Sequence, residues 1–343
     1  MDTLLLPKEK LKDFLKSIST GEAQLIAPVA KDGITRFEHI EDIDSAELDL
    51  DDYTATTKKV MFPQTETLFA FRQTGDGAAF EEGGDVPRTV VFGIRPCDAK
   101  SFVVLDPLFS KDFDDPYYMK RRAASVIIGH ACKEPTNRCF CPSVAGSPSG
   151  TEGMDLLLTD IDDGYFVQVV TDKGREVIDG TKELFGEATG DHKAMKESAD
   201  KEALSRIRRQ VDMKNLYEKL PGAFDHPIWK EIGNKCIGCG ICTYNCPTCH
   251  CFDIQDEGTE YEGRRIRVWD ACMYPEFTVH ASGENPRHDR SARIRNRMMH
   301  KFSYYPLNLG YIGCVGCGRC IEMCPVNEDL IDILNRVREV IDE

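Results

Sequence analysis

The sequence predicts a mixed α/β fold in two parts, an α/β domain over residues 1–215 and a smaller, mostly helical domain over residues 216–343. Short apolar, β-branched runs alternate with helix-like stretches in the first part. In the second part, 11 of the 15 cysteines lie between Cys236 and Cys324. One cysteine pattern occurs twice there, and such a repeat indicates a duplicated structural unit.

Length and cysteine usage limit what the cysteines do. A chain of 343 residues is long enough to bury real cores without disulfides, and an odd number of cysteines argues against complete pairing. The N-terminus lacks the basic and long apolar regions of a secretory signal, and no apolar run is long enough for a transmembrane segment. We therefore expect a cytoplasmic protein, in which clustered cysteines favour metal binding or catalysis.

The charge balance is acidic. Lys and Arg total 43 against 58 Asp and Glu, which gives a net charge of −15 with neutral histidine. This charge repels a phosphate backbone, so nucleic acid is not expected as a partner.

The first part is expected to alternate strands with helices. Strands are expected at Leu25–Val29, Val90–Ile94, Ser125–Ile128 and Phe166–Val170. Helices are expected at Lys8–Ser17 and within Lys182–Leu220, where apolar residues recur at helical spacing. Pro, Ser and Gly mark residues 142–153 as a loop, and the polar stretch at residues 186–200 suggests a linker into the second part.

The repeated pattern is C-x2-C-x2-C-x3-C-P, the spacing of bacterial dicluster ferredoxins. In that arrangement three thiolates hold one [4Fe-4S] cluster and the fourth holds the other. The first cluster is therefore assigned to Cys236, Cys239, Cys242 and Cys324, and the second to Cys314, Cys317, Cys320 and Cys246. Paired zinc sites are the alternative, but they ordinarily use two separated C-x2-C pairs. The second part is thus predicted to be a 2[4Fe-4S] ferredoxin-like domain.

An insert at residues 247–313 interrupts this domain and carries three further cysteines, Cys249, Cys251 and Cys272. They either pack as small core residues around the second cluster or form a further cluster or a redox thiol. The insert also holds a cationic run, Arg287–Lys301, which either raises cluster potentials, forms an exposed basic helix face or docks an acidic partner. After Glu328, apolar spacing predicts an amphipathic helix.

A third site is expected in the first part. Cys97 and Cys132 each follow a predicted strand, and parallel strands would open both loops at one edge of the sheet. Cys139 and Cys141 follow in a loop, where alternate residues face one side. The four thiols suit a third [4Fe-4S] cluster, with a zinc site or unligated cysteines as alternatives. Asp98 is expected to be a solvated loop acid or a helix cap, with a role as substitute ligand as the other possibility.

Several segments together resemble the iron-sulfur β subunit of cytoplasmic sulfhydrogenases and the corresponding iron-sulfur subunit of anaerobic sulfite reductase. These segments are RPCD (95–98), CFCP (139–142), NCPTCHCFD (245–253), WDAC (269–272), HKFSYYP (300–306) and CVGCGRC (314–320). The resemblance implies a subunit that relays electrons between a flavin subunit handling NAD(P)H or ferredoxin and a catalytic subunit. It also implies that Cys97, Cys132, Cys139 and Cys141 bind an extra cluster. The Cys-Cys dipeptides of heterodisulfide reductase catalytic subunits are absent, which argues against direct disulfide reduction.

Three functions compete at this point. The leading one is a non-catalytic electron-transfer subunit of an anaerobic hetero-oligomer, because the sequence has no G-x-G-x-x-G, P-loop, H-E-x-x-H or G-x-S-x-G motif and clusters pass single electrons. The second is a self-contained iron-sulfur reductase, with its reaction centre at the N-terminal cysteine site or at a free thiol of the insert. The third is a non-redox scaffold held together by metal.

Overall fold

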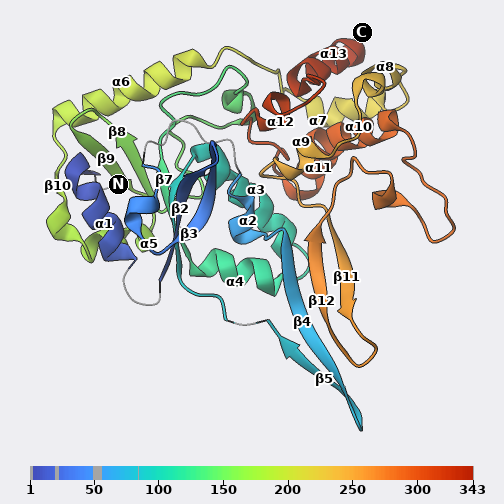
Figure 1. The fold of residues 1–343 in the computed structure, drawn as a ribbon. Coiled ribbons are helices and arrows are strands. Elements are labelled where there is room, and N and C mark those ends of the chain that lie inside the picture. Colours follow the sequence, from blue (N-terminus) through green and yellow to red (C-terminus); the bar gives the residue numbers. More distant parts are fainter. Residues whose placement is uncertain (1–2, 20–22, 49–55, 84, 343) are drawn as a thin grey trace.

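The computed structural model describes residues 3–19, 23–48, 56–83 and 85–342, and contains two β-sheets (Figure 1). The larger sheet has eight strands in the order β10-β1-β9-β8-β7-β6-β2-β3. Its strands are β1 (Thr3–Pro7), β2 (Gln24–Lys31), β3 (Ile34–Ile40), β6 (Thr89–Ile94), β7 (Ser125–His130), β8 (Leu156–Asp160), β9 (Gly164–Val169) and β10 (Gly186–Glu187). The four strands β2, β6, β7 and β8 pair in parallel, and the outer pairs are antiparallel. All four predicted strands are confirmed.

The centre of this sheet forms the main hydrophobic core. Every residue of β6 and β7 is buried, as expected for parallel strands covered on both faces. The helices of this part are α1 (Leu11–Ile18), α2 (Lys58–Met61), α3 (Pro96–Ser110), α4 (Pro116–Ala124) and α5 (Asp172–Asp179). Helix α1, with the 3-10 turn Lys8–Lys10 before it, confirms the first predicted helix.

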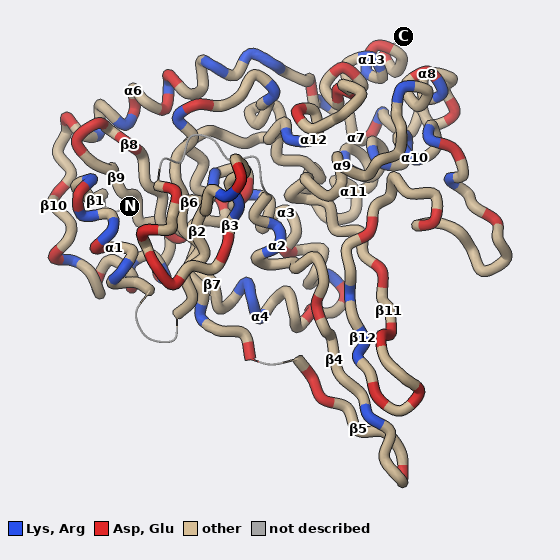
Figure 2. The backbone as a smooth tube through the Cα atoms, in the orientation of Figure 1, with Lys and Arg blue, Asp and Glu red and all other residues tan. Residues whose placement is uncertain are grey.

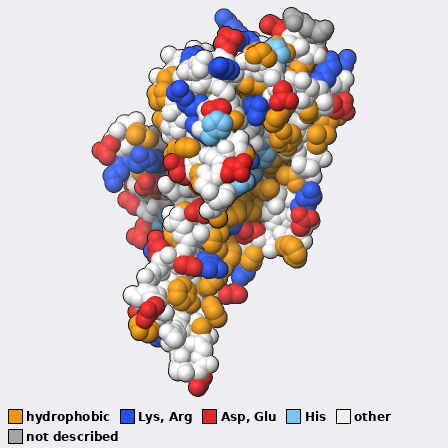
Figure 3. All heavy atoms as spheres, turned by 90° about the vertical axis from the view of Figure 1, so that its right-hand side faces the viewer, with side chains coloured by type: hydrophobic (Ala, Val, Ile, Leu, Met, Phe, Trp, Pro, Cys, Tyr) orange, Lys and Arg blue, Asp and Glu red, His pale blue; other side chains and the backbone are white. Residues whose placement is uncertain are grey.

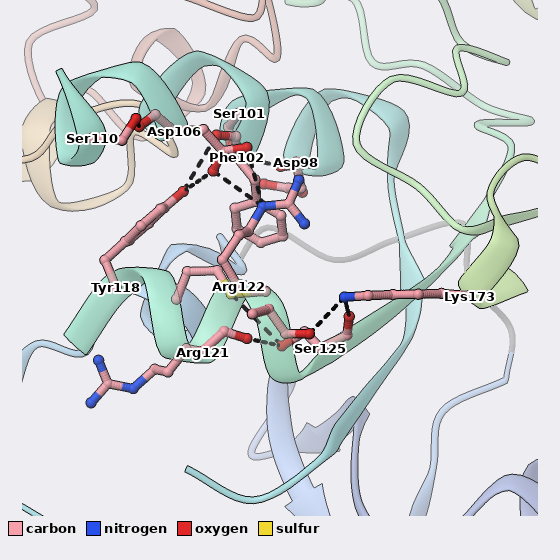
Figure 4. Close-up of polar contacts among 12 residues, drawn as sticks. Asp98, Ser101, Phe102, Asp106, Ser110, Tyr118, Arg121, Arg122, Ser125 and Lys173 are labelled. Atoms are coloured by element: carbon pink, nitrogen blue, oxygen red, sulfur yellow. Dashed lines mark hydrogen bonds and ion pairs between the residues drawn. The ribbon is translucent and has the colours of Figure 1, made fainter. Parts of the chain in front are cut away.

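A polar network fixes α3, which carries Cys97, and β7, which precedes Cys132 (Figure 4). The Tyr118 hydroxyl donates to Asp106 at 2.8 Å, and Arg122 donates to the same carboxylate at 3.1 Å. Lys173 donates to the backbone oxygen of Ser125 at the start of β7 at 3.0 Å. Helix α4 is thereby held against α3, and α5 against β7.

The second sheet projects from the rest of the molecule in Figure 1. It is antiparallel, with the order β11-β12-β4-β5, and its strands are β4 (Thr65–Thr74), β5 (Gly77–Glu82), β11 (Phe252–Gly258) and β12 (Glu262–Trp269). Acidic residues of β11 face basic residues of β12 (Figure 2), through the pairs Glu257–Arg264 and Asp256–Arg265. Strands of the insert therefore complete a sheet begun in the first part of the chain.

The helices that follow are α6 (Gly190–Arg206), α7 (Leu216–Lys219), α8 (Ile228–Lys235), α9 (Ile241–Tyr244), α10 (Arg290–Met299), α11 (Tyr305–Leu309), α12 (Arg319–Glu322) and α13 (Leu330–Asp342). A π-helix at His300–Tyr304 joins α10 to α11. Short 3-10 turns lie at Ile43–Ser45, Cys141–Val144, Lys182–Leu184, Leu220–Ala223 and Glu276–Thr278. None of the described helices combines the length and the apolar character that a membrane crossing requires.

Of the two expectations for this region, the linker is not found and the C-terminal helix is. The predicted linker at residues 186–200 is wrong, because most of it lies in α6, whose start is fixed by reciprocal hydrogen bonds between Thr189 and His192. The predicted C-terminal amphipathic helix is confirmed as α13. Its buried residues Leu334 and Val337 join a second core that contains Trp229.

Candidate metal centre

The two cysteine motifs fold alike, as a loop followed by a one-turn helix, α9 or α12. In the first motif the Gly238 amide donates to the Cys236 sulfur at 3.3 Å, and in the second the Gly316 amide donates to the Cys314 sulfur at 3.4 Å. Each fourth cysteine, Cys246 or Cys324, closes its turn with a backbone hydrogen bond of 3.3 Å. The sequence repeat is therefore also a repeat of backbone structure.

The first predicted ligand group surrounds a cavity of about 50 Å³. The cavity is lined by all four assigned cysteines and by one from the other group, namely Cys236, Cys239, Cys242, Cys324 and Cys320. Apolar side chains such as Met273 and Ile294 complete the lining. The chain returns from the second motif to bring Cys324 to the first, as the ferredoxin pattern requires.

The second predicted group lies between the two motifs. Cys246 interacts electrostatically with Cys314, Cys317 and Cys320, so the four thiols are close neighbours. Burial raises the pKa of the Cys314 thiol to about 12. A buried thiol of this kind needs a cationic partner to become a thiolate ligand.

The N-terminal cysteines also converge. Strands β6 and β7 are parallel, and Cys97 at the start of α3 and Cys132 after β7 leave the sheet at one edge, as expected. A cavity of about 30 Å³ is lined by Cys97, Cys132, Cys139 and Cys141. Gly316 and Cys317 of the second motif line the same cavity, and the Phe140 amide donates to the Gly316 oxygen at 2.9 Å. The third site therefore borders the second.

The expectation for Asp98 is wrong. Its side chain is fully buried and forms a bidentate ion pair with Arg319 of the second motif, at 2.8 and 2.5 Å. A carboxylate in this position is neither solvated nor a helix cap, and both its oxygens are occupied by the guanidinium. The pair joins the helix that carries Cys97 to the motif that carries Cys317.

The cationic run is not simply an exposed helix face. Arg297 and Lys301 are buried, and Arg297 donates to the Cys242 oxygen at 3.1 Å. Lys301 donates to the Cys246 sulfur at 3.3 Å. Burial alone lowers the pKa of Lys301, but the Cys246 and Cys249 thiols raise it well above its usual range. Two cations of the run therefore face the cysteine motifs from inside the protein.

These surroundings fit iron-sulfur clusters. Cysteine-ligated clusters are anions, and backbone amides and cations that point at the sulfurs stabilise them. Among the residues that the structure describes, no three His, Cys, Asp or Glu side chains are arranged to hold a single metal ion. Thiols spread around a cavity suit a larger cofactor better than one zinc ion.

Comparison with known proteins agrees with this chemistry. Residues 235–328 match the family model described as a 4Fe-4S dicluster domain. Over 318 residues the chain is 33% identical to the sulfhydrogenase 2 subunit beta of Pyrococcus furiosus, and the match covers 92% of each chain. The chain belongs to the sulfhydrogenase β-subunit family. The resemblance seen in the sequence is thereby confirmed, and the chain is an iron-sulfur protein.

A second member of the comparison is more distant. The chain is 22% identical over 217 residues to the F420-dependent formate dehydrogenase subunit beta of Methanocaldococcus jannaschii, covering 61% of this chain and 47% of that protein. No solved structure matches the chain.

The three cysteines outside the predicted ligand groups, Cys249, Cys251 and Cys272, lie beside the second ligand group. Cys249 and Cys272 are buried, and the Cys249 amide donates to the Cys246 oxygen at 3.3 Å. Lys58 of α2 interacts with the Cys249, Cys246 and Cys251 thiols and is itself buried. Sequence reasoning missed Lys58, because no motif surrounds it and it reaches the cysteines only through the tertiary fold.

Proposed function

We propose that this chain is a non-catalytic electron-relay subunit of a hetero-oligomeric redox complex and holds three [4Fe-4S] clusters. The ligand sets are Cys236, Cys239, Cys242 and Cys324 for cluster 1; Cys314, Cys317, Cys320 and Cys246 for cluster 2; and Cys97, Cys132, Cys139 and Cys141 for cluster 3. One partner handles NAD(P)H with a flavin, or ferredoxin. The other is a catalytic subunit of the hydrogenase type or of the sulfur, sulfite or disulfide reductase type.

The position of the second motif carries this proposal. Its Cys320 lines the cavity of the first group, and its Cys317 lines the cavity of the N-terminal group. The three sites therefore follow one another in the order 1, 2, 3, with the cluster 2 loop in contact with both neighbours. A row of one-electron centres that touch in sequence suits a relay better than an isolated reaction centre.

Surface exposure at the cluster 1 end supports docking of a partner there. Cys239 is exposed, and the neighbouring Ile237 side chain is 56% exposed. An apolar side chain beside a redox centre at the surface offers a short path to a partner and apolar area for the contact.

The protein's own residues control the charge of this row. Each cluster would take up and release single electrons. Lys301 and Arg297 place positive charge beside the cysteines of clusters 1 and 2, whereas the charge of Arg319, between Cys317 and Cys97, is balanced by Asp98. Since each added electron makes a cluster more negative, these cations stabilise the reduced forms.

The test is metal analysis of anaerobically purified protein, with acid-labile sulfide counting and EPR. Three clusters predict about 12 iron atoms per chain, and Cys132→Ala is expected to lower this to about 8 while the dicluster EPR signal remains. Ser147→Ala is the matched control, because Ser147 lines the same cavity without a thiol. Zinc with little sulfide would overturn the relay, and substrate reduction by the chain without a partner would favour a self-contained reductase.

A further inference from the structure

Cys251 and Cys272 lie at the two open ends of the β11–β12 hairpin. Cys251 directly precedes β11, and Cys272 follows β12 by three residues. The register pairs Phe252 with Trp269, and the Asp270 amide then donates to the Cys251 oxygen at 2.9 Å. The hairpin therefore brings together two cysteines that are distant in sequence.

The two side chains lie close together. Cys272 is buried in the second hydrophobic core, and Cys251 packs against that core. Hydrogen bonding between the two thiols is the largest cause of the pKa shift of each. Neither thiol lines the cavities of the first cysteine group or of the N-terminal group. Two neighbouring thiols outside such a cavity can form an S–S bond.

Cations and an aromatic ring surround this pair. The Lys58 ammonium lies 3.7 Å from the centre of the Trp269 ring, in the segment between the two cysteines. The hydrogen bond from Cys272 lowers the pKa of Cys251, with contributions from Lys301 and Lys58. The same hydrogen bond raises the pKa of Cys272. One thiol favours the thiolate and the other retains its proton, which is typical of redox-active dithiols.

We propose that Cys251 and Cys272 form a reversible dithiol/disulfide couple that exchanges two electrons with the dicluster centre. The couple lies beside cluster 2, because Cys249 interacts with Cys272 and is hydrogen-bonded to Cys246 through its backbone amide. This inference rests on the proposed electron relay, since the relay supplies and accepts the electrons.

The redox step balances within the protein. On oxidation the Cys272 S–H bond breaks, the Cys251 thiolate sulfur and the Cys272 sulfur form one S–S bond, one proton leaves to solvent, and two electrons pass singly to the two clusters of the dicluster centre. Reduction reverses each step. Some redox partners, such as hydride donors, exchange two electrons at once, whereas clusters exchange one. A two-electron couple beside the clusters would store two electrons between these two kinds of partner.

The two cysteines differ in their exposure at the surface. Cys272 is buried and Cys251 is partly exposed, next to the exposed Phe252 side chain. Figure 3 shows hydrophobic side chains gathered at the base of the projecting sheet and along it. Limited access favours exchange with the neighbouring cluster over exchange with dissolved thiols.

The experiment uses the full chain, purified anaerobically and poised with dithionite or with a mild oxidant. Alkylation and peptide mass spectrometry measure the Cys251–Cys272 disulfide, and coulometric titration counts electrons per chain. We expect the disulfide only in the oxidised sample and about two more electrons in the wild type than in Cys251→Ser or Cys272→Ser. Phe252→Leu is the control, because it changes the side chain next to Cys251 without removing a thiol, and it should keep the two extra electrons.

Iron and sulfide are counted in the same samples, so failure of the relay is read separately from failure of the couple. Wild-type iron with no disulfide in the oxidised sample, or an equal electron count in Cys272→Ser, would overturn the couple and leave the relay standing. Loss of about four iron atoms in both serine variants would also overturn it, because the pair would then be cluster ligands.

Discussion

Arg319 and Asp98 form a buried ion pair that joins the second cysteine motif to the helix carrying Cys97. Each terminal guanidinium nitrogen of Arg319 donates to one carboxylate oxygen of Asp98, at 2.8 and 2.5 Å. The two residues lie 221 positions apart in sequence. The N-terminal and ferredoxin-like parts of the chain are therefore held together by a polar contact directly between sites 2 and 3.

The first prediction removes one charge of this pair. Asp98→Asn keeps the side-chain volume but leaves the Arg319 charge buried without its partner, which costs about 3–5 kcal/mol. We expect a lower midpoint of thermal unfolding in anaerobic calorimetry and a loss of iron from the N-terminal site. Glu322→Gln is the control, because Glu322 and Arg138 pair across the same junction at its exposed edge. Such a pair contributes less than about 1 kcal/mol, so equal effects of the two variants would contradict the prediction.

The second prediction concerns Gly316, where the second motif meets the Cys139–Cys141 loop. Its φ is +68°, and a Cβ there would lie 2.4 Å from the Cys141 Cα and 2.5 Å from its nitrogen. Gly316→Ala must therefore displace backbone, so we expect both iron content and thermal stability to fall. Gly310 has a similar φ of +77° but open space around its Cβ position. Gly310→Ala should show only the backbone strain of about 1–2 kcal/mol and should keep its iron.

The third prediction concerns the base of the projecting sheet. Arg267 of β12 is buried between Glu66 of β4 and Asp115, which caps α4. Arg267→Met leaves the Glu66 carboxylate buried with one partner fewer, and about 3–5 kcal/mol of stability is expected to be lost. Hydrogen exchange should then show faster opening of β4 and β12. Arg264→Met, which breaks an exposed pair with Glu257, should leave these exchange rates unchanged.

Local patterns made much of this structure predictable. Three cysteines separated by two residues each predict a loop followed by one helical turn. The apolar runs that precede Cys97 and Cys132 predict two strands, and these strands are neighbours and parallel in the structure. In both cases the information lies within a few residues of the feature it predicts.

The features that were missed depend on contacts between distant segments. Residues 65–82 and 252–269 form one sheet, and neither segment alone indicates its partner. The burial of Asp98 depends on Arg319, and Lys58 reaches the cysteines only after α2 packs near the hairpin ends. A polar composition led to the expectation of a linker at residues 186–200, but polar residues are also common on an exposed helix such as α6.

The last prediction tests whether the buried cation of the insert sets a cluster potential. Lys301 donates to the Cys246 sulfur at 3.3 Å, and also to the Thr248 hydroxyl at 3.0 Å and the Gly313 oxygen at 2.7 Å. Lys301→Met removes the charge and keeps most of the apolar stem. Because an added electron makes the cluster more negative, loss of the cation should lower the reduction potential of cluster 2. A charge-assisted hydrogen bond is worth about 1.5–3 kcal/mol, so a shift on the order of 100 mV is expected for a one-electron centre.

Potentiometric titration followed by EPR measures this shift, with iron content as the check that all clusters are present. Arg295→Met is the matched control, because it removes one positive charge from the same run. The Arg295 guanidinium instead lies 3.9 Å from the centre of the Phe224 ring and donates to the Phe224 oxygen at 3.1 Å. An equal shift in both variants would mean that net charge alone matters. A shift confined to Lys301→Met would instead assign the effect to the buried charge that is hydrogen-bonded to Cys246, since the two variants change the net charge equally.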